Sequence, residues 1–212
     1  GMTCTDGVSV DGRVIDQGDC AGPRSAKNVL LNPLVDAAVF ESARGGILRE
    51  GLGVDKCDVA IVTNIGEADH LGKAFIDSPE DMFKVKRTPV DVVLPTGMAV
   101  LNATDPLVVE MASLSAGGVT FFAIDSNHPV IQRHREAGLR TVFVRDRTVM
   151  LSQGSEELPL IKLDDLPSTH AGRVRFQVEN VLAAAAAGWA LNVNLQQLAI
   201  GLQAFQGNVF DN

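Results

Sequence analysis

Uninterrupted apolar runs and amphipathic segments alternate along most of the chain. Residues 36–42 and 58–64 are short apolar runs that end in polar residues, and strands are also expected at residues 98–105, 118–125 and 140–146. Continuous apolar runs are typical of strands that are buried on both faces of a parallel sheet. The pattern therefore predicts a sheet in which most strands are parallel.

Helix signals occupy the segments between these runs. Residues 23–33 are bracketed by prolines, and residues 78–93 open with Ser78 as the N-cap and Pro79 at the first helical position. Pro89 is expected to break or kink that second helix. Four further helices are predicted, at residues 106–114, 128–138, 176–191 and 194–205. Because strands alternate with helices, the predicted class is α/β, a mostly parallel sheet flanked by helices.

Two segments have the pattern of antiparallel strands. Residues 7–16 form two short alternating runs joined by Asp11-Gly12, which is a strong hairpin signal. Residues 147–163 surround a Gly-Ser turn. A small antiparallel addition to the parallel sheet is therefore expected near residues 147–163.

Composition narrows the class of protein. The 212 residues suit one large domain, and a hydrophobic content of 46% is sufficient for a buried core. The net charge of −8 argues against nucleic acid as a partner, because such a partner needs a clustered basic surface. The longest apolar stretch, residues 181–191, is too short to cross a membrane. Three widely spaced cysteines indicate reduced thiols in a cytoplasmic protein.

Glu41 is the first candidate for chemistry. It closes a predicted buried strand, and ligands bind outside the carboxyl ends of strands in open α/β sheets. Gly45 and Gly46 follow, and glycines allow a ligand to approach the backbone closely. The alternative is that Glu41 is an ordinary polar residue at a strand end.

The segment 63–72, "TNIGEADHLG", places Asp69 and His70 just beyond the next buried strand. A carboxylate and an imidazole beside Glu41 would suit a divalent cation. Magnesium usually takes few protein ligands together with phosphate oxygens, although imidazole is not its preferred ligand. The alternative for His70 is a loop histidine that caps a helix.

Further polar residues lie at strand ends and helix starts. Lys84 and Lys86 lie on the helix after this loop, where exposed lysines ordinarily serve solubility. Asn102 and Asp105 follow a third strand, although Asp105 could equally be only the N-cap before Pro106. The convergence of such groups at three strand ends indicates an α/β ligand site, with or without a metal.

One expected feature of nucleotide enzymes is missing from the printed sequence. It contains neither a GxxxxGK[ST] phosphate loop nor a GxGxxG motif. The glycine pairs at 45–46 and 117–118 are not followed by Lys-Ser or Lys-Thr. A nucleotide-binding protein of this class normally holds phosphates with such a loop.

Several motifs, taken in order, resemble the central domain of the Mur ligase superfamily, and in particular the Mur-ligase-like part of cyanophycin synthetases. They are "TCTDGVSVDGRVIDQGDCAGPRSAKNVL", "ESARGGILREGLG", "TNIGEADHLG", "VLNATDP" and "RFQVENVLAAAAA". The resemblance covers nearly the whole chain. It implies a P-loop NTPase-like fold, ATP and Mg²⁺ as cofactors, and formation of an amide bond through an acyl-phosphate. In the cyanophycin branch, arginine is joined to an aspartate carboxylate.

The resemblance also implies roles for individual residues. Glu41 matches the family glutamate that binds Mg²⁺ next to the γ-phosphate, and His70 matches the histidine of a second Mg²⁺ site. Lys86 matches the lysine that many Mur ligases carbamylate to supply a carboxylate for that second ion. The catalytic and metal set is therefore expected to be Glu41, His70 and Lys86.

A second group of residues is implied to contact the nucleotide. Asn180 matches the second asparagine of the family's "HNxxN" motif, and it shares a helix face with Gln177. The first two positions of that motif are Phe176 and Gln177 here, which departs from the family pattern. Asn102 and Asp105 stand in the equivalent of the family's "NADDP" motif.

The resemblance leads to an expectation about domain organisation. Family members carry "GTNGKT" before the segment that begins this chain, and a further domain after a "PGRF" segment. Residues 1–212 are therefore interpreted as one central, ATP-binding domain that lacks the phosphate-loop segment and the C-terminal ligase domain. Its sheet would then lack one central strand, and the chain alone would be inactive.

Two alternatives stay open beside this interpretation. One is a catalytically dead domain of the same lineage, kept for binding or assembly. The other is a Mur-type or folylpolyglutamate-type ligase with a different substrate. The expected partners are ATP and an amino-acid or poly-aspartate substrate, and a homo-oligomer is plausible because exposed sheet edges invite pairing with another chain.

Overall fold

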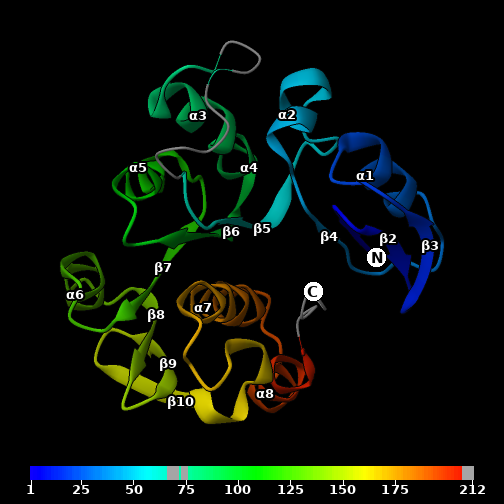
Figure 1. The fold of residues 1–212 in the computed structure, drawn as a ribbon. Coiled ribbons are helices and arrows are strands. Elements are labelled where there is room, and N and C mark those ends of the chain that lie inside the picture. The colour runs from blue at the N-terminus through cyan, green and yellow to red at the C-terminus, as the bar shows by residue number, and fades with distance from the viewer. Residues whose placement is uncertain (66–71, 73–75, 207–212) are drawn as a thin grey trace.

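The computed structural model describes residues 1–65, 72 and 76–206, and it contains two β-sheets (Figure 1). Sheet A has the strand order β3-β2-β1-β4, and sheet B has the order β10-β9-β8-β7-β6-β5. Sheet A consists of β1 (Met2–Cys4), β2 (Gly7–Val10), β3 (Arg13–Gln17) and β4 (Val39–Phe40). Sheet B consists of β5 (Cys57–Val62), β6 (Val93–Asn102), β7 (Gly118–Asp125), β8 (Arg140–Arg145), β9 (Thr148–Gln153) and β10 (Glu156–Lys162).

The predicted mostly parallel sheet with an antiparallel addition is confirmed. Strands β5 to β8 pair in parallel, and β9 and β10 extend the sheet in antiparallel fashion. The hairpin around Asp11-Gly12 is also present, since β2 and β3 pair in antiparallel fashion across it. Asp11 and Gly12 have φ of 50° and 71°, the left-handed values that a tight two-residue hairpin turn needs.

Helices pack against both sheets, and the six predicted helices start within one residue of their predicted positions. Ser78 caps α3 by accepting a hydrogen bond from the backbone N–H of Asp81, and Pro79 is the first helical residue. The predicted helix at 78–93 is interrupted near Pro89 and becomes two helices. The helices are α1 (Pro23–Leu30), α2 (Arg44–Glu50), α3 (Pro79–Lys86), α4 (Thr88–Asp91), α5 (Pro106–Glu110), α6 (Pro129–Glu136), α7 (Arg175–Ala190) and α8 (Leu195–Ala204). Three 3₁₀ turns complete them, at Met111–Leu114, Leu163–Asp165 and Pro167–Thr169.

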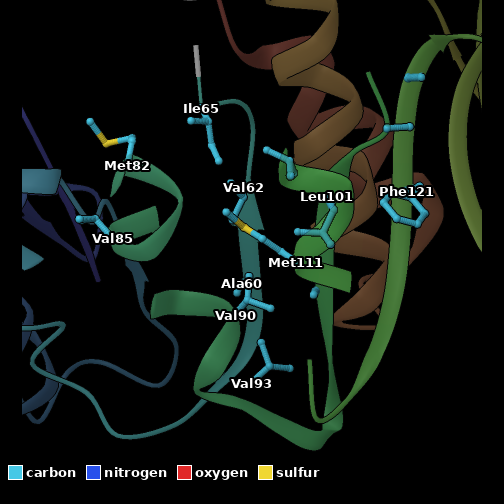
Figure 2. Close-up of a cluster of buried hydrophobic side chains, with 14 of the residues drawn as sticks. Ala60, Val62, Ile65, Met82, Val85, Val90, Val93, Leu101, Met111 and Phe121 are labelled. Carbon is cyan, nitrogen blue, oxygen red and sulfur yellow. The ribbon is translucent and has the colours of Figure 1, made fainter. Parts of the chain in front are cut away.

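Sheet B carries the main core on both of its faces. On one face, Val62, Leu101 and Phe121 pack beneath α3 to α6, and Figure 2 shows this cluster with Met111. On the other face, strand residues pack against α7, whose alanines let the helix approach closely (Figure 1). Neighbouring residues of β6 and β7 serve opposite faces, which explains why these strands read as continuous apolar runs.

Sheet A has a much smaller core. Val8, Cys20 and Val29 form its buried centre, with Phe40 packed beside them, and α1 supplies Val29. Every residue of the edge strand β3 is exposed. Sheet A therefore depends on few buried apolar contacts.

Two strands differ from their predicted extent. The strand expected at 36–42 is reduced to β4, because it pairs on one side only, with β1 through Met2↔Val39 and Thr3↔Phe40. The strand expected at 98–105 begins five residues earlier, where Val93 pairs with Cys57, and ends at Asn102. Among the described residues, β4 and β5 are both edge strands. The expected pairing of sheet edges with another chain stays a prediction.

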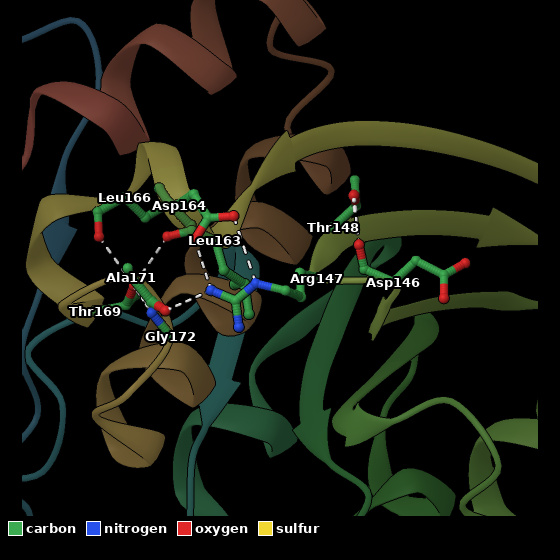
Figure 3. A network of polar contacts seen from close by, with 9 residues as sticks. All are labelled: Asp146, Arg147, Thr148, Leu163, Asp164, Leu166, Thr169, Ala171 and Gly172. Carbon is green, nitrogen blue, oxygen red and sulfur yellow. Dashed lines mark hydrogen bonds and ion pairs between the residues drawn. The ribbon is translucent and has the colours of Figure 1, made fainter.

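A polar network fixes the segment that leads into α7 (Figure 3). Arg147 lies in the turn between β8 and β9, and its guanidinium donates to Asp164 Oδ1 at 2.6 Å and to the Ala171 carbonyl at 2.8 Å. The hydrogen bond from Arg147 holds the pKa of Asp164 below its ordinary value. Thr169 Oγ1 is buried, and it lies 2.9 Å from both the Leu166 carbonyl and the Gly172 nitrogen. These contacts set the position from which α7 starts.

A pH effect on stability is expected from His134 of α6. Its Nε2 lies 3.0 Å from the Val119 carbonyl, and its ring meets Phe121 edge-on. Burial lowers the pKa of His134, while the hydrogen bond to Val119 opposes this shift. The unfolded state therefore binds a proton at His134 more readily than the native state does. The contribution of neutral His134 to the stability of the fold is complete above about pH 6.5 and declines as the pH falls below it.

The measurement is the urea midpoint at about pH 7.5 and about pH 5.5 for the native chain and His134→Gln. The native chain should lose more stability on acidification than the variant. Equal losses would show that His134 does not contribute to the pH dependence.

No described helix has the length and apolar character needed to cross a membrane.

Candidate functional site

Glu41 lies at the carboxyl end of β4, next to the end of its partner strand β1. Its backbone N–H donates to the Thr3 carbonyl at 2.9 Å. Its carboxylate accepts from Thr5: the backbone nitrogen lies 2.9 Å from Oε2, and the hydroxyl lies 2.8 and 2.9 Å from Oε1 and Oε2. Both residues are exposed. The carboxylate is therefore oriented by the chain and open to a ligand.

The two glycines after Glu41 have different surroundings. A Cβ on Gly46 would lie 3.1 Å from the Ala21 carbonyl oxygen and 3.3 Å from Gly22 Cα, so this glycine lets α2 pack against the segment before α1. A Cβ on Gly45 would meet only the Arg49 side chain, at 3.5 Å. Close packing within the chain thus accounts for Gly46. A small pocket beside Glu41 is lined by residues of this region, among them Gly22, Ser42, Gly46 and Leu52.

A second feature lies just beyond β5, where one peptide group is held from both sides. Lys86 Nζ donates to the Asn64 carbonyl at 3.1 Å, and the Ile65 N–H donates to Asp105 Oδ2 at 2.6 Å. The Asn64 carbonyl and the Ile65 N–H belong to the same peptide unit. Lys86 of α3 and Asp105 after β6 are therefore brought together at the end of β5.

The polar groups of Asp105 and Asn102 face the chain's own backbone. Asp105 Oδ1 accepts from the N–H groups of Leu107 and Val108, so it is the N-cap of α5. Asn102 is buried, and its Oδ1 accepts from the backbone and the hydroxyl of Thr104. The capping role that the sequence left open for Asp105 is confirmed, and contacts of either residue with a nucleotide stay a prediction.

Asn180 and Gln177 share one face of α7, as predicted. Asn180 Nδ2 donates to Gln177 Oε1 at 3.4 Å, and the neighbouring Phe176 is 60% exposed. Helix α7 packs on the face of sheet B opposite α3, so the helix that carries these amides and the helix that carries Lys86 lie on opposite faces of that sheet. Helix α2, which follows Glu41, packs against α3, which carries Lys86. The structure thus brings the elements of Glu41 and Lys86 together.

Asp69 and His70 lie outside the described residues. Over residues 1–65, 72 and 76–206, no three histidine, cysteine or acidic side chains gather as a metal cluster. A magnesium ion bound by one carboxylate, waters and phosphate oxygens does not require such a cluster.

Thr5 is the residue at this site to which sequence reasoning assigned no role. It precedes Asp6 in "TCTDG", but the contact with Glu41 spans 36 positions of the sequence. The sequence analysis predicted no strand at Met2–Cys4, and it is the parallel pairing of β1 with β4 that brings the Thr5 hydroxyl and the Glu41 carboxylate together.

Asp105→Ala is expected to destabilise the fold by about 2 kcal/mol, because it removes both a helix cap and the bond to Ile65. Urea denaturation of the variant measures this loss. Asp125→Ala is the matched control, because within the described part of the chain the exposed Asp125 carboxylate accepts a single turn hydrogen bond, from Asn127 N–H, and its loss should be less than half as large. Equal losses for the two variants would contradict the double role of Asp105.

Comparison with known proteins places this geometry in context. A family model described as the Mur ligase middle domain matches residues 21–188. Cyanophycin synthetases from Synechocystis and Crocosphaera subtropica are 40% and 39% identical to this chain over 97% and 98% of its length. The chain spans only 23% and 24% of those relatives. The UDP-N-acetylmuramoylalanine–D-glutamate ligase of Symbiobacterium thermophilum is 28% identical over 70% of this chain and 30% of its own length.

Solved structures agree on the fold. MurF from Acinetobacter baumannii superposes with a TM-score of 0.59 at 23% identity, covering 84% of this chain and 36% of the other. The α/β architecture predicted from the sequence is therefore that of known ligase structures, and the resemblance identified from the motifs is confirmed.

Proposed function

The chain belongs to the Mur ligase middle-domain family, and on that premise we propose that it is the ATP-binding domain of an ATP-dependent amide-bond ligase of the cyanophycin synthetase type. The observation that carries this proposal is the 40% identity to a cyanophycin synthetase over 97% of the chain. The position of Glu41 supports it, because open α/β sheets bind ligands outside the carboxyl ends of their strands.

The proposed reaction has two steps. A carboxylate oxygen of an aspartate attacks the γ-phosphorus of ATP, so that ADP leaves and an acyl-phosphate forms. The amine of an amino acid, arginine by the resemblance noted in the sequence, then attacks the acyl carbon, loses a proton and displaces phosphate. In phosphoryl transfer, positioning and charge stabilisation supply most of the catalysis.

Glu41 is the residue that would hold a magnesium ion at the γ-phosphate. Its exposed carboxylate fits that role, because Thr5 supplies two donors and leaves acceptor capacity on both oxygens. Bound magnesium would screen the negative charge that develops on the phosphate oxygens. We assign Lys86 and His70 to a second cation, for which Lys86 would supply oxygen ligands if its amine reacted with carbon dioxide to form a carbamate.

The nucleotide base is proposed to lie near Asn180, with Asn102 and Asp105 shaping the adjacent strand end. The chain is proposed to need a phosphate-binding segment in addition to residues 1–212. Edge strands β4 and β5 are compatible with one further strand between them. On this proposal the isolated chain has little activity of its own.

The test is isothermal titration with ATP, with and without Mg²⁺, on the isolated chain and on the longest natural reading frame that contains it. We expect saturable, Mg²⁺-dependent binding in the longer protein, and ADP release only when an aspartate-bearing acceptor and an amino acid are present. Absence of ATP binding in the longer protein would overturn the proposal and favour a binding or assembly role.

A further inference from the structure

We infer that Thr5 is a positioning residue that sets the Glu41 carboxylate for a nucleotide-bound divalent cation. The inference rests on the proposed function, and it adds a residue to which neither the motifs nor the comparisons give a role. The structural basis is the pair of donors, one backbone and one side-chain, that a single residue directs at both carboxylate oxygens.

The contact between Thr5 and Glu41 extends the pairing of strands β1 and β4 beyond their carboxyl ends. Strands β1 and β4 pair in parallel through Thr3↔Phe40, and the Glu41 N–H continues the ladder by donating to Thr3. The Glu41 side chain then reaches across to Thr5, which lies two residues after Thr3 and directly follows β1. Main chain and side chain of Glu41 are thus both fixed by the same short segment.

The arrangement leaves the carboxylate able to bind a cation. An ionised carboxylate has about four lone-pair sites, and the Thr5 N–H and O–H use two of them. Both residues are exposed, so water and ions reach the remaining sites. A glutamate in solvent otherwise samples many rotamers, and ordering it on cation binding would reduce affinity. Thr5 removes that cost before the ion arrives.

The sequence around Thr5 offers an internal comparison. Thr3 lies two residues earlier on β1, and its hydroxyl is buried without a hydrogen-bond partner among the described residues. Removing the Thr3 hydroxyl should therefore leave the hydrogen bonds of Glu41 intact, because Glu41 N–H donates to the backbone carbonyl of Thr3. Thr3→Val is a matched control for Thr5→Val, because both substitutions replace a hydroxyl group with a methyl group and the two positions are two residues apart.

The experiment measures the Mg²⁺ concentration that gives half-maximal ATP binding in the longest natural reading frame. Thr5→Val keeps the backbone donor and loses the hydroxyl, and it should raise this concentration about three- to tenfold. Thr5→Ser, which keeps both donors, should restore a value close to that of the native protein. Thr3→Val should not change it. Urea midpoints of the variants check that the fold is retained.

Two outcomes would overturn the inference alone. One is an unchanged Mg²⁺ dependence in Thr5→Val while the native protein binds ATP with Mg²⁺. The other is an increased KM for the acceptor with unchanged Mg²⁺ dependence, which would make Thr5 a substrate contact. If the native protein itself shows no Mg²⁺-dependent ATP binding, the proposed function fails and the inference falls with it.

Discussion

Glu41→Gln is expected to reduce Mg²⁺-dependent ligase activity of the natural protein at least about a hundredfold. The substitution keeps the size of the side chain and still offers one oxygen to the Thr5 donors. It removes the negative charge on which a hard cation depends, and a divalent ion at transferring phosphate carries a large share of transition-state stabilisation. The measurement is kcat/KM for ATP at saturating acceptor and amine.

The matched control for this variant is Glu50→Gln. Glu50 ends α2, nine positions after Glu41, and its exposed side chain lies 3.6 Å from Arg24. Its replacement should leave kcat/KM essentially unchanged, since exposed ion pairs contribute little. Activity of Glu41→Gln within a few-fold of the native protein would remove Glu41 from the proposed cation site.

Gly117→Ala is expected to destabilise the chain by about 3 kcal/mol. A Cβ at this position would lie 2.4 Å from the carbonyl oxygen of Gly97 and 2.5 Å from that of Leu94. Both contacts are with backbone, which cannot move without disturbing β6, an interior strand paired with β5 and β7. The loss is read from urea denaturation as a lower midpoint with an unchanged m-value.

Gly118→Ala tests whether the effect comes from backbone contact or from loss of glycine as such. Its Cβ would lie 2.9 Å from Met98 Cε and 3.0 Å from Met98 Sδ, a flexible side-chain end, and at an ordinary contact distance of 3.8 Å from the Gly97 carbonyl oxygen. We expect a loss of less than about 1 kcal/mol. Similar losses for the two neighbouring variants would contradict the packing explanation. Gly117 thus has a structural reason unrelated to phosphate binding.

Local patterns were sufficient for most of the fold. Strand β7 occupies the predicted residues 118–125, and the Asp11-Gly12 turn and the Ser78 cap are present because each depends on neighbouring residues. The division into two sheets could not be predicted from local patterns, because it depends on which strands pair although they lie far apart in the sequence. For the same reason β4 is shorter than its apolar run, and β6 extends back through Pro95, Thr96 and Gly97 to reach Cys57.

The site was predictable in position but not in contacts. The sequence placed Glu41 and Asp105 at strand ends, where the structure has them. The sequence could not show whether Asp105 binds a ligand or caps a helix, because an aspartate before a proline can do either. Thr5 and the held Asn64–Ile65 peptide depend on side chains that lie more than 20 positions from their partners.

The small core of sheet A has a consequence for ligand affinity. Val8, Cys20 and Val29 hold together the four strands that carry Thr5 and Glu41, whereas sheet B is anchored on both faces. Regions with few buried contacts open locally at a lower free energy than the whole domain. A ligand that binds only the closed form has its apparent affinity reduced by the fraction of molecules that are closed. Substitutions that fill out this small core could therefore tighten nucleotide binding without contacting the nucleotide.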